Sequence, residues 1–176
     1  LYVGRMLRDK GIDELVQAWR LLRDQNHSCE LKLCGAVDSG NPNSYTVGEM
    51  NELSSEAGIH WLGRRNDVLE QMRNAAIVVL PTYREGFPKV LLEAGMARKA
   101  VVTTDVPGCR DIVKHQTSGL LVRPRNVDEL YKAIKQLYFD RALRNRLAGN
   151  LNDIVLKGFT DRTINPLWGK LYNRIL

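Results

Sequence analysis

The chain has 176 residues, of which 44% are hydrophobic and 26% are charged, and it carries a formal net charge of +6. These values are typical of one water-soluble globular domain with a sizeable core. No apolar run approaches the ~20 residues that a membrane-spanning helix needs. The basic residues are dispersed and accompany no recognised nucleic-acid-binding motif, so we expect no nucleic-acid partner.

Three cysteines, Cys29, Cys34 and Cys109, are scattered along the chain and include no CxxC pair. This spacing argues against a disulfide framework and against a structural zinc site, and it fits a reducing cytosol. Residues 1–4 lack the basic and long apolar regions of a signal peptide and are typical of the end of a strand. We therefore interpret the chain as an excised piece of a longer, cytoplasmic protein.

Strand-like and helix-like runs alternate along the chain. After the strand end at residues 1–4, the first half is expected to contain a helix over 12–22, a strand over 31–34, a polar loop over 35–43, a helix over 46–57, a strand over 59–62 and a short helix over 67–73. The second half is expected to contain strands over 76–80, 101–103 and 119–122, and helices over 88–96, 110–113, 127–138, 140–156 and 164–176. Alternating βα units predict an α/β fold with a mainly parallel, six-stranded sheet.

The segment from Glu85 to Glu93 carries the strongest functional pattern, because it places two carboxylates eight residues apart after a buried strand. Pro88 fits the first helical position, so Glu85 is expected on a loop at the carboxyl end of that strand and Glu93 in the helix. In open α/β sheets ligands bind in this crevice, and the N–H groups of a helix start favour an anion. The arrangement suits a nucleotide-sugar, which has hydroxyls at both ends and phosphate between.

With these residues, the chain resembles the retaining glycosyltransferases of family 4, which have the GT-B fold and carry this pair of glutamates in a Glu-Gly-Phe-Gly/Pro context. Further matching blocks lie at residues 3–5, 10–11, 61–63, 104–108 and 119–122. The resemblance implies that residues 1–176 form the Rossmann-like, three-layer αβα donor-binding domain, which is the C-terminal half of such an enzyme. It also implies an N-terminal acceptor-binding half, absent here, to which the final helix at 164–176 crosses back.

Arg5 and Lys10 follow the first strand, at the same edge of the sheet as Glu85. Fixed cations aimed at a diphosphate stabilise the negative charge that develops as a glycosidic bond breaks. The resemblance implies that Arg5 and Lys10 contact the diphosphate of the donor and that Glu85 contacts the transferred sugar. It further implies that Glu93 accepts hydrogen bonds from the ribose hydroxyls.

The resemblance assigns the remaining donor-binding positions mainly through the backbone. Gly86, Phe87, Pro88, Lys89 and Val90 are expected to lie against the phosphates and sugar. Many relatives have glycine in place of Pro88, which has no N–H to donate, and Lys89 replaces a commonly apolar residue. Lys89 either touches the sugar or phosphate or points to solvent. Both changes put the sugar specificity in question.

Two further segments match parts of the donor site. Arg64 and Arg65 follow a strand end and match the base-contacting segment of the family, and Gly35 would let its loop approach the ligand closely. The loop over 35–42 is similar to loops of capsule, O-antigen and exopolysaccharide enzymes, which favours UDP-linked sugars.

The function implied by the resemblance is transfer of a hexose or N-acetylhexosamine from a nucleoside-diphosphate sugar to a glycan or lipid-linked acceptor in polysaccharide biosynthesis. The acceptor would bind through the missing domain, so the chain alone is expected to be inactive. The full-length enzyme would associate peripherally with the inner face of the membrane. Such enzymes need no metal or other cofactor, and the histidines here show no ligand spacing.

Three other readings stay open. A nicotinamide-binding dehydrogenase would require GxGxxG after the first strand, which residues 4–7 and 35–40 do not supply, and no P-loop is present. A non-catalytic domain that binds nucleotide-sugars could have kept the same residues. A GT-B phosphorylase or nucleotide-sugar epimerase could share the fold, and a phosphorylase would carry a pyridoxal-binding lysine.

Overall fold

The computed structural model describes residues 1–24 and 28–159, which form alternating strands and helices. In chain order these are β1 (Tyr2–Val3), η1 (Arg8–Lys10), α1 (Ile12–Arg23), β2 (Leu31–Cys34), α2 (Val47–Ser55), β3 (Ile59–Gly63), α3 (Val68–Asn74), β4 (Ile77–Leu80), α4 (Lys89–Met96), β5 (Ala100–Thr104), α5 (Pro107–Ile112), β6 (Leu120–Val122), α6 (Val127–Phe139) and α7 (Arg141–Gly158). The final helix expected over 164–176 lies outside the described residues.

The six strands form two parallel three-stranded sheets, with the orders β1-β2-β3 and β4-β5-β6. The backbone of Leu1 joins the two pieces. Its amino group donates to the Ile77 carbonyl at 2.9 Å, and its carbonyl accepts from the Val79 N–H at 2.9 Å. The six parallel strands predicted from the sequence are therefore confirmed, but the expected single sheet is two pieces that meet between β1 and β4.

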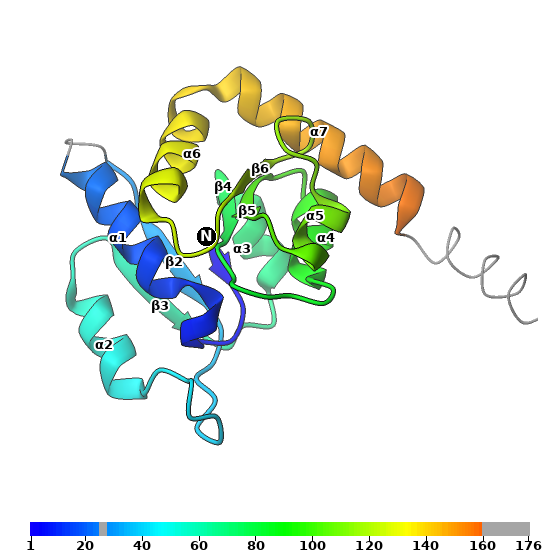
Figure 1. The fold of residues 1–176 in the computed structure, drawn as a ribbon. Coiled ribbons are helices and arrows are strands. Elements are labelled where there is room, and N and C mark those ends of the chain that lie inside the picture. The colour runs from blue at the N-terminus through cyan, green and yellow to red at the C-terminus, as the bar shows by residue number, and fades with distance from the viewer. Residues whose placement is uncertain (25–27, 160–176) are drawn as a thin grey trace, which may run out of the picture.

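Helices cover both faces of this sheet. Every residue of β4 and β5 is buried. Because successive side chains of a strand point to opposite faces, complete burial requires cover on both sides. Figure 1 shows α6 lying beside α1, against which it packs, and α4 packs against α7. This is the three-layer α/β arrangement that the sequence predicts.

Two prolines begin helices differently from the sequence-based expectation. Pro88 is the N-cap of α4, with extended backbone (φ −77°, ψ 92°), and not its first helical residue. The sequence predicts a helix only over 110–113, but α5 begins earlier, with Pro107 as its first residue. A proline at the first helical position loses no helical hydrogen bond, because that N–H has no partner within the helix.

Gly11 allows two loops at the carboxyl edge of the sheet to touch. It ends η1 in the left-handed region (φ 72°), and a Cβ added there would lie 2.1 Å from the Pro81 carbonyl oxygen. Any side chain would therefore strain the backbone and push the segment after β1 away from the segment after β4.

We expect Gly11→Ala to lower the free energy of unfolding by about 2 kcal/mol, because alanine disfavours the left-handed region and meets Pro81. Gly149→Ala is the matched control. Gly149 lies within α7 with no neighbouring atom in reach of an added Cβ, so alanine there should stabilise by about 0.5–1 kcal/mol. Chemical denaturation of both variants measures this, and equal effects of the two substitutions would contradict the packing argument.

Candidate functional site

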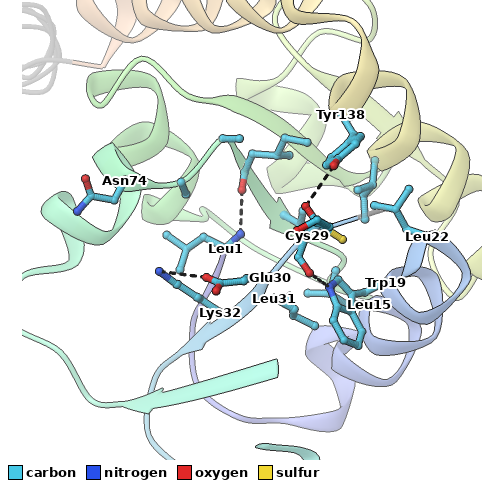
Figure 2. Close-up of a pocket in the computed structure, with 16 residues that line it drawn as sticks. Leu1, Leu15, Trp19, Leu22, Cys29, Glu30, Leu31, Lys32, Asn74 and Tyr138 are labelled. Carbon is cyan, nitrogen blue, oxygen red and sulfur yellow. Dashed lines mark hydrogen bonds and ion pairs between the residues drawn. The ribbon is translucent and has the colours of Figure 1, made fainter. Parts of the chain in front are cut away.

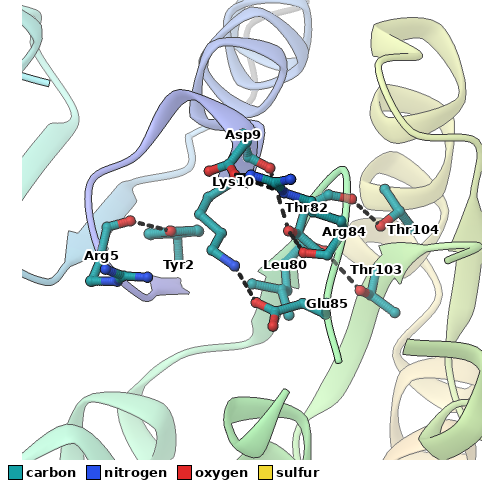
Figure 3. Close-up of polar contacts among 10 residues, drawn as sticks. All are labelled: Tyr2, Arg5, Asp9, Lys10, Leu80, Thr82, Arg84, Glu85, Thr103 and Thr104. Atoms are coloured by element: carbon teal, nitrogen blue, oxygen red, sulfur yellow. Dashed lines mark hydrogen bonds and ion pairs between the residues drawn. The ribbon is translucent and has the colours of Figure 1, made fainter. Parts of the chain in front are cut away.

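The residues that the sequence singles out lie where the strands end. Arg5 follows β1, Gly35 follows β2, and Arg64 and Arg65 follow β3, while Glu85 lies on the connection from β4 to α4. All are therefore at the carboxyl edge of the sheet, drawn from both of its pieces. The structure brings Lys10 and Glu85 into direct contact, and Arg5 lies on the same segment after β1 as Lys10 (Figure 3).

Lys10 and Glu85 form the central ion pair of this edge. The Lys10 Nζ donates to Glu85 Oε1, and the two side chains are only 16% and 21% exposed. Shielding from water strengthens the attraction, and it also makes either charge costly to leave alone. The pair joins the cation expected to bind diphosphate directly to the carboxylate expected to bind sugar.

Arg5 is held in a more open position. Its guanidinium donates to Asp38 Oδ2 at 2.8 Å, with the side chains 62% and 34% exposed. Its carbonyl accepts a hydrogen bond from the Tyr2 hydroxyl at 2.7 Å. Burial raises the pKa of Tyr2, so this phenol stays a neutral donor. The Arg5 backbone is thus anchored to the core, while its side chain faces water.

Asp9, to which the sequence assigned no role, ties the segment carrying Lys10 to the segment carrying Glu85. Its carbonyl accepts from the Tyr83 N–H at 2.9 Å and lies 3.4 Å from the Thr82 hydroxyl. Its carboxylate accepts from Arg84 at 3.3 Å, as Figure 3 shows. The other carboxylate oxygen, Oδ1, is buried and has no hydrogen-bond partner among the described residues.

Strand β5 and helix α5 hold the Glu85 segment from the other side. The Thr103 hydroxyl donates to the Leu80 carbonyl at 2.7 Å, and the Thr104 hydroxyl donates to the Thr82 carbonyl. The Gly108 N–H donates to the Glu85 carbonyl at 3.2 Å, and a Cβ on Gly108 would lie 2.5 Å from that oxygen. Glu85 is therefore fixed through its backbone as well as through its ion pair.

At the start of α4, several backbone N–H groups have no hydrogen-bond acceptor in the described part of the chain. The N–H groups of Gly86, Phe87, Lys89 and Val90 make no hydrogen bond to any described residue. Free N–H groups at a helix start carry partial positive charge and favour an anion. Pro88, which is buried, supplies no N–H and interrupts the series.

The side chains of this segment differ in exposure. Phe87, Lys89 and Glu93 are exposed, whereas Val90 is half-buried. Phe87 lies against Phe159, with ring centroids 5.9 Å apart. Although apolar residues flank Glu93 in the sequence, its carboxylate faces water and makes no ion pair or hydrogen bond within residues 1–24 and 28–159. It is free to accept hydrogen bonds from a ligand.

The remaining predicted positions lie after β2 and β3. Arg65 donates two hydrogen bonds to Asp67, each of 2.7 Å, and they hold the pKa of that carboxyl well below its usual range. Arg64 is exposed. The close approach that Gly35 allows is to the Gly4 carbonyl, which a Cβ would meet at 1.7 Å. Gly35 therefore brings the ends of β1 and β2 together, next to Arg5.

A mainly apolar cavity of the described residues lies elsewhere. It measures about 300 Å³ and opens at the amino ends of β2 and β4, where Leu1, Trp19 and Tyr138 line it (Figure 2). Its charged groups, Glu30 and Lys32, pair with each other at 3.7 Å. The cavity contains none of the predicted site residues, so the candidate site is the charged carboxyl edge and not this mainly apolar space.

The described residues contain neither a candidate metal site nor a candidate membrane-spanning helix. No group of three or more histidine, cysteine or acidic side chains gathers there in a way that could hold a metal ion. No helix within those same ranges is both long and apolar enough to span a bilayer.

Known proteins are similar to this chain in both sequence and fold. The chain is 32% identical over 176 residues to the N,N'-diacetylbacillosaminyl-diphospho-undecaprenol alpha-1,3-N-acetylgalactosaminyltransferase of Campylobacter jejuni, covering 100% of the chain and 44% of that protein. It is 28% identical to the capsular polysaccharide biosynthesis glycosyltransferase CapM of Staphylococcus aureus, covering 99% of the chain and 46% of CapM. Its structure matches that of Anabaena HepE in complex with UDP with a TM-score of 0.86 at 24% identity, covering 98% of this chain and 48% of HepE.

The chain thus spans less than half the length of the curated relatives it matches. The match to HepE confirms the Rossmann-like α/β fold expected for the C-terminal half of a GT-B enzyme. Residues 1–152 match the family model for glycosyl transferases group 1, so the chain belongs to that family.

Proposed function

We propose that this chain binds the nucleotide-sugar donor of a retaining glycosyltransferase, which moves a hexose or N-acetylhexosamine to a glycan or lipid-linked acceptor. The observation that carries the proposal is the set of free N–H groups at the start of α4, with the Lys10–Glu85 pair before it and the free carboxylate of Glu93 beyond it. An anion site between two carboxylates fits a diphosphate between a sugar and a ribose.

The charges of the site suit the chemistry of donor cleavage. When the bond between the anomeric carbon and the diphosphate oxygen breaks, the diphosphate leaves with the electron pair and gains negative charge. Lys10, Arg5 and the N–H groups of α4 would stabilise that charge. In the proposed reaction the leaving phosphate accepts the proton of the attacking acceptor hydroxyl on the same face of the sugar, so the anomeric configuration is retained.

The names of the relatives support the substrate classes. HepE was crystallised with UDP, which favours a UDP-sugar donor. The Campylobacter relative is named for transfer of N-acetylgalactosamine to an undecaprenol diphosphate, and CapM is named for capsular polysaccharide biosynthesis. We therefore propose a role in polysaccharide biosynthesis on the cytoplasmic side of a membrane, with no metal required, because Arg5, Lys10 and the α4 donors take the place of a cation at the diphosphate.

Calorimetric titration with UDP, GDP, ADP and NAD, first without metal and then with magnesium, tests the proposal. We expect saturable, metal-independent binding of one nucleoside diphosphate, with UDP favoured. Binding of NAD alone would overturn the proposal in favour of a nicotinamide enzyme. Binding that appears only with magnesium would contradict its metal-independent part.

Glu93→Gln should weaken binding of the nucleoside diphosphate by ~1–3 kcal/mol, because an amide loses the charge-assisted hydrogen bonds to the ribose hydroxyls. Glu70→Gln on α3 is the matched control, since Glu70 is also exposed on a short helix but lies outside the proposed site. Isothermal calorimetry on both variants measures the difference. If Glu93→Gln binds the nucleoside diphosphate as tightly as the unchanged protein does, the assignment of Glu93 to the ribose is wrong.

The purified chain should transfer sugar negligibly, even with a UDP-sugar and a lipid-linked acceptor present. The physical reason is that positioning two substrates together supplies much of the rate, and we propose that the acceptor is held by a further domain. Release of UDP measured over hours, against a buffer control, checks this expectation. Robust transfer by these 176 residues would show instead that they hold the acceptor themselves.

A further inference from the structure

The Lys10–Glu85 ion pair already uses the two charges that the proposed donor would need. Lys10 would have to contact the diphosphate, and Glu85 would have to contact the sugar, yet in the structure each is the partner of the other. Neither side chain is more than 21% exposed, so water solvates each charge only weakly. A diphosphate that takes Lys10 therefore has to draw it away from Glu85.

The backbone gives the two residues little freedom to separate. Asp9 joins the Lys10 segment to Tyr83 through a main-chain hydrogen bond of 2.9 Å. Glu85 is held by the Gly108 N–H at 3.2 Å. The exchange must then occur by rotation of the lysine side chain, which has four flexible carbons and a compact charge.

We propose that Glu85 competes with the diphosphate for Lys10, so that the site favours an intact nucleotide-sugar over a free nucleoside diphosphate. This inference rests on the proposed function. A free nucleoside diphosphate that captures Lys10 leaves the Glu85 carboxylate shielded from water and without a partner, which is costly. An intact donor removes that cost, because the hydroxyls of its sugar donate hydrogen bonds to the freed carboxylate.

The competition also favours release of the product. Once the sugar has left, Glu85 loses the hydroxyls that compensated it, and it regains Lys10 as its partner. The nucleoside diphosphate then loses a cation at the moment when it has to leave. Glu85 would in this way act on the diphosphate without touching it.

The substitution Glu85→Gln keeps the shape of the side chain and removes the competing charge. We expect it to tighten binding of UDP by about threefold to tenfold, a range that corresponds to a partly buried ion pair. The advantage of UDP-glucose or UDP-N-acetylgalactosamine over UDP should shrink in the same variant. If Glu85 instead serves to hold Lys10 in place, UDP binding should weaken, so the sign of the change distinguishes the two roles.

Two further variants separate the local contact from general charge. Asp111→Asn removes one negative charge from an exposed position on α5, the helix whose Gly108 contacts the Glu85 carbonyl. It should change UDP affinity by less than about twofold. In a Lys10→Met background, the added Glu85→Gln substitution should no longer tighten UDP binding, because the group competed for is gone.

Calorimetry with UDP and both UDP-sugars on these variants gives the test, with thermal unfolding to check that each is folded. Tighter UDP binding by Glu85→Gln, absent from Asp111→Asn and from the Lys10→Met background, supports the proposal. Unchanged or weaker UDP binding, or an equal gain in Asp111→Asn, overturns it while leaving the proposed function intact. If neither the unchanged protein nor Glu85→Gln binds any nucleoside diphosphate, the proposed function fails and this inference fails with it.

Discussion

The candidate site depends on one main-chain hydrogen bond, from the Tyr83 N–H to the Asp9 carbonyl at 2.9 Å. It connects the segment after β1 with the segment after β4, which are far apart in the sequence. The left-handed Gly11 permits this approach, since any Cβ there would meet Pro81. The ion pair between Lys10 and Glu85 requires the two segments to lie at this spacing. The positions of the charged side chains of the candidate site therefore depend on this main-chain hydrogen bond.

The elements that position the site could largely be predicted from the sequence. The buried, β-branched run that became β4 and the turn before α4 have strong local patterns, so Glu85 was correctly placed at the carboxyl edge. The family match confirms the resemblance at the level of glycosyl transferases group 1. The ends of helices were predicted less well. Pro88 and Pro107 each fit two local conformations, and the choice between them depends on tertiary packing, such as the contact of Gly108 with the Glu85 carbonyl.

The partners of the charged residues could not be predicted. Asp9 matched no motif, and Asp38 lay in a polar loop, yet each holds a cation of the site: Arg84 and Arg5, respectively. Such pairs join residues more than thirty positions apart, and no periodicity or spacing in the sequence records them. The one available signal was the number of basic residues at strand ends, since cations brought together on one edge generally need acidic neighbours.

The two pieces of the sheet meet between β1 and β4, and the candidate site straddles that seam. Leu1 fastens the seam at the amino ends of the strands, through Ile77 and Val79, and Asp9 fastens it at the carboxyl ends, through Tyr83. Two attachment points at opposite ends prevent one piece from swivelling against the other. The proposed donor site would therefore have a fixed width, and adaptation to different ligands would be left to the long side chains at its rim.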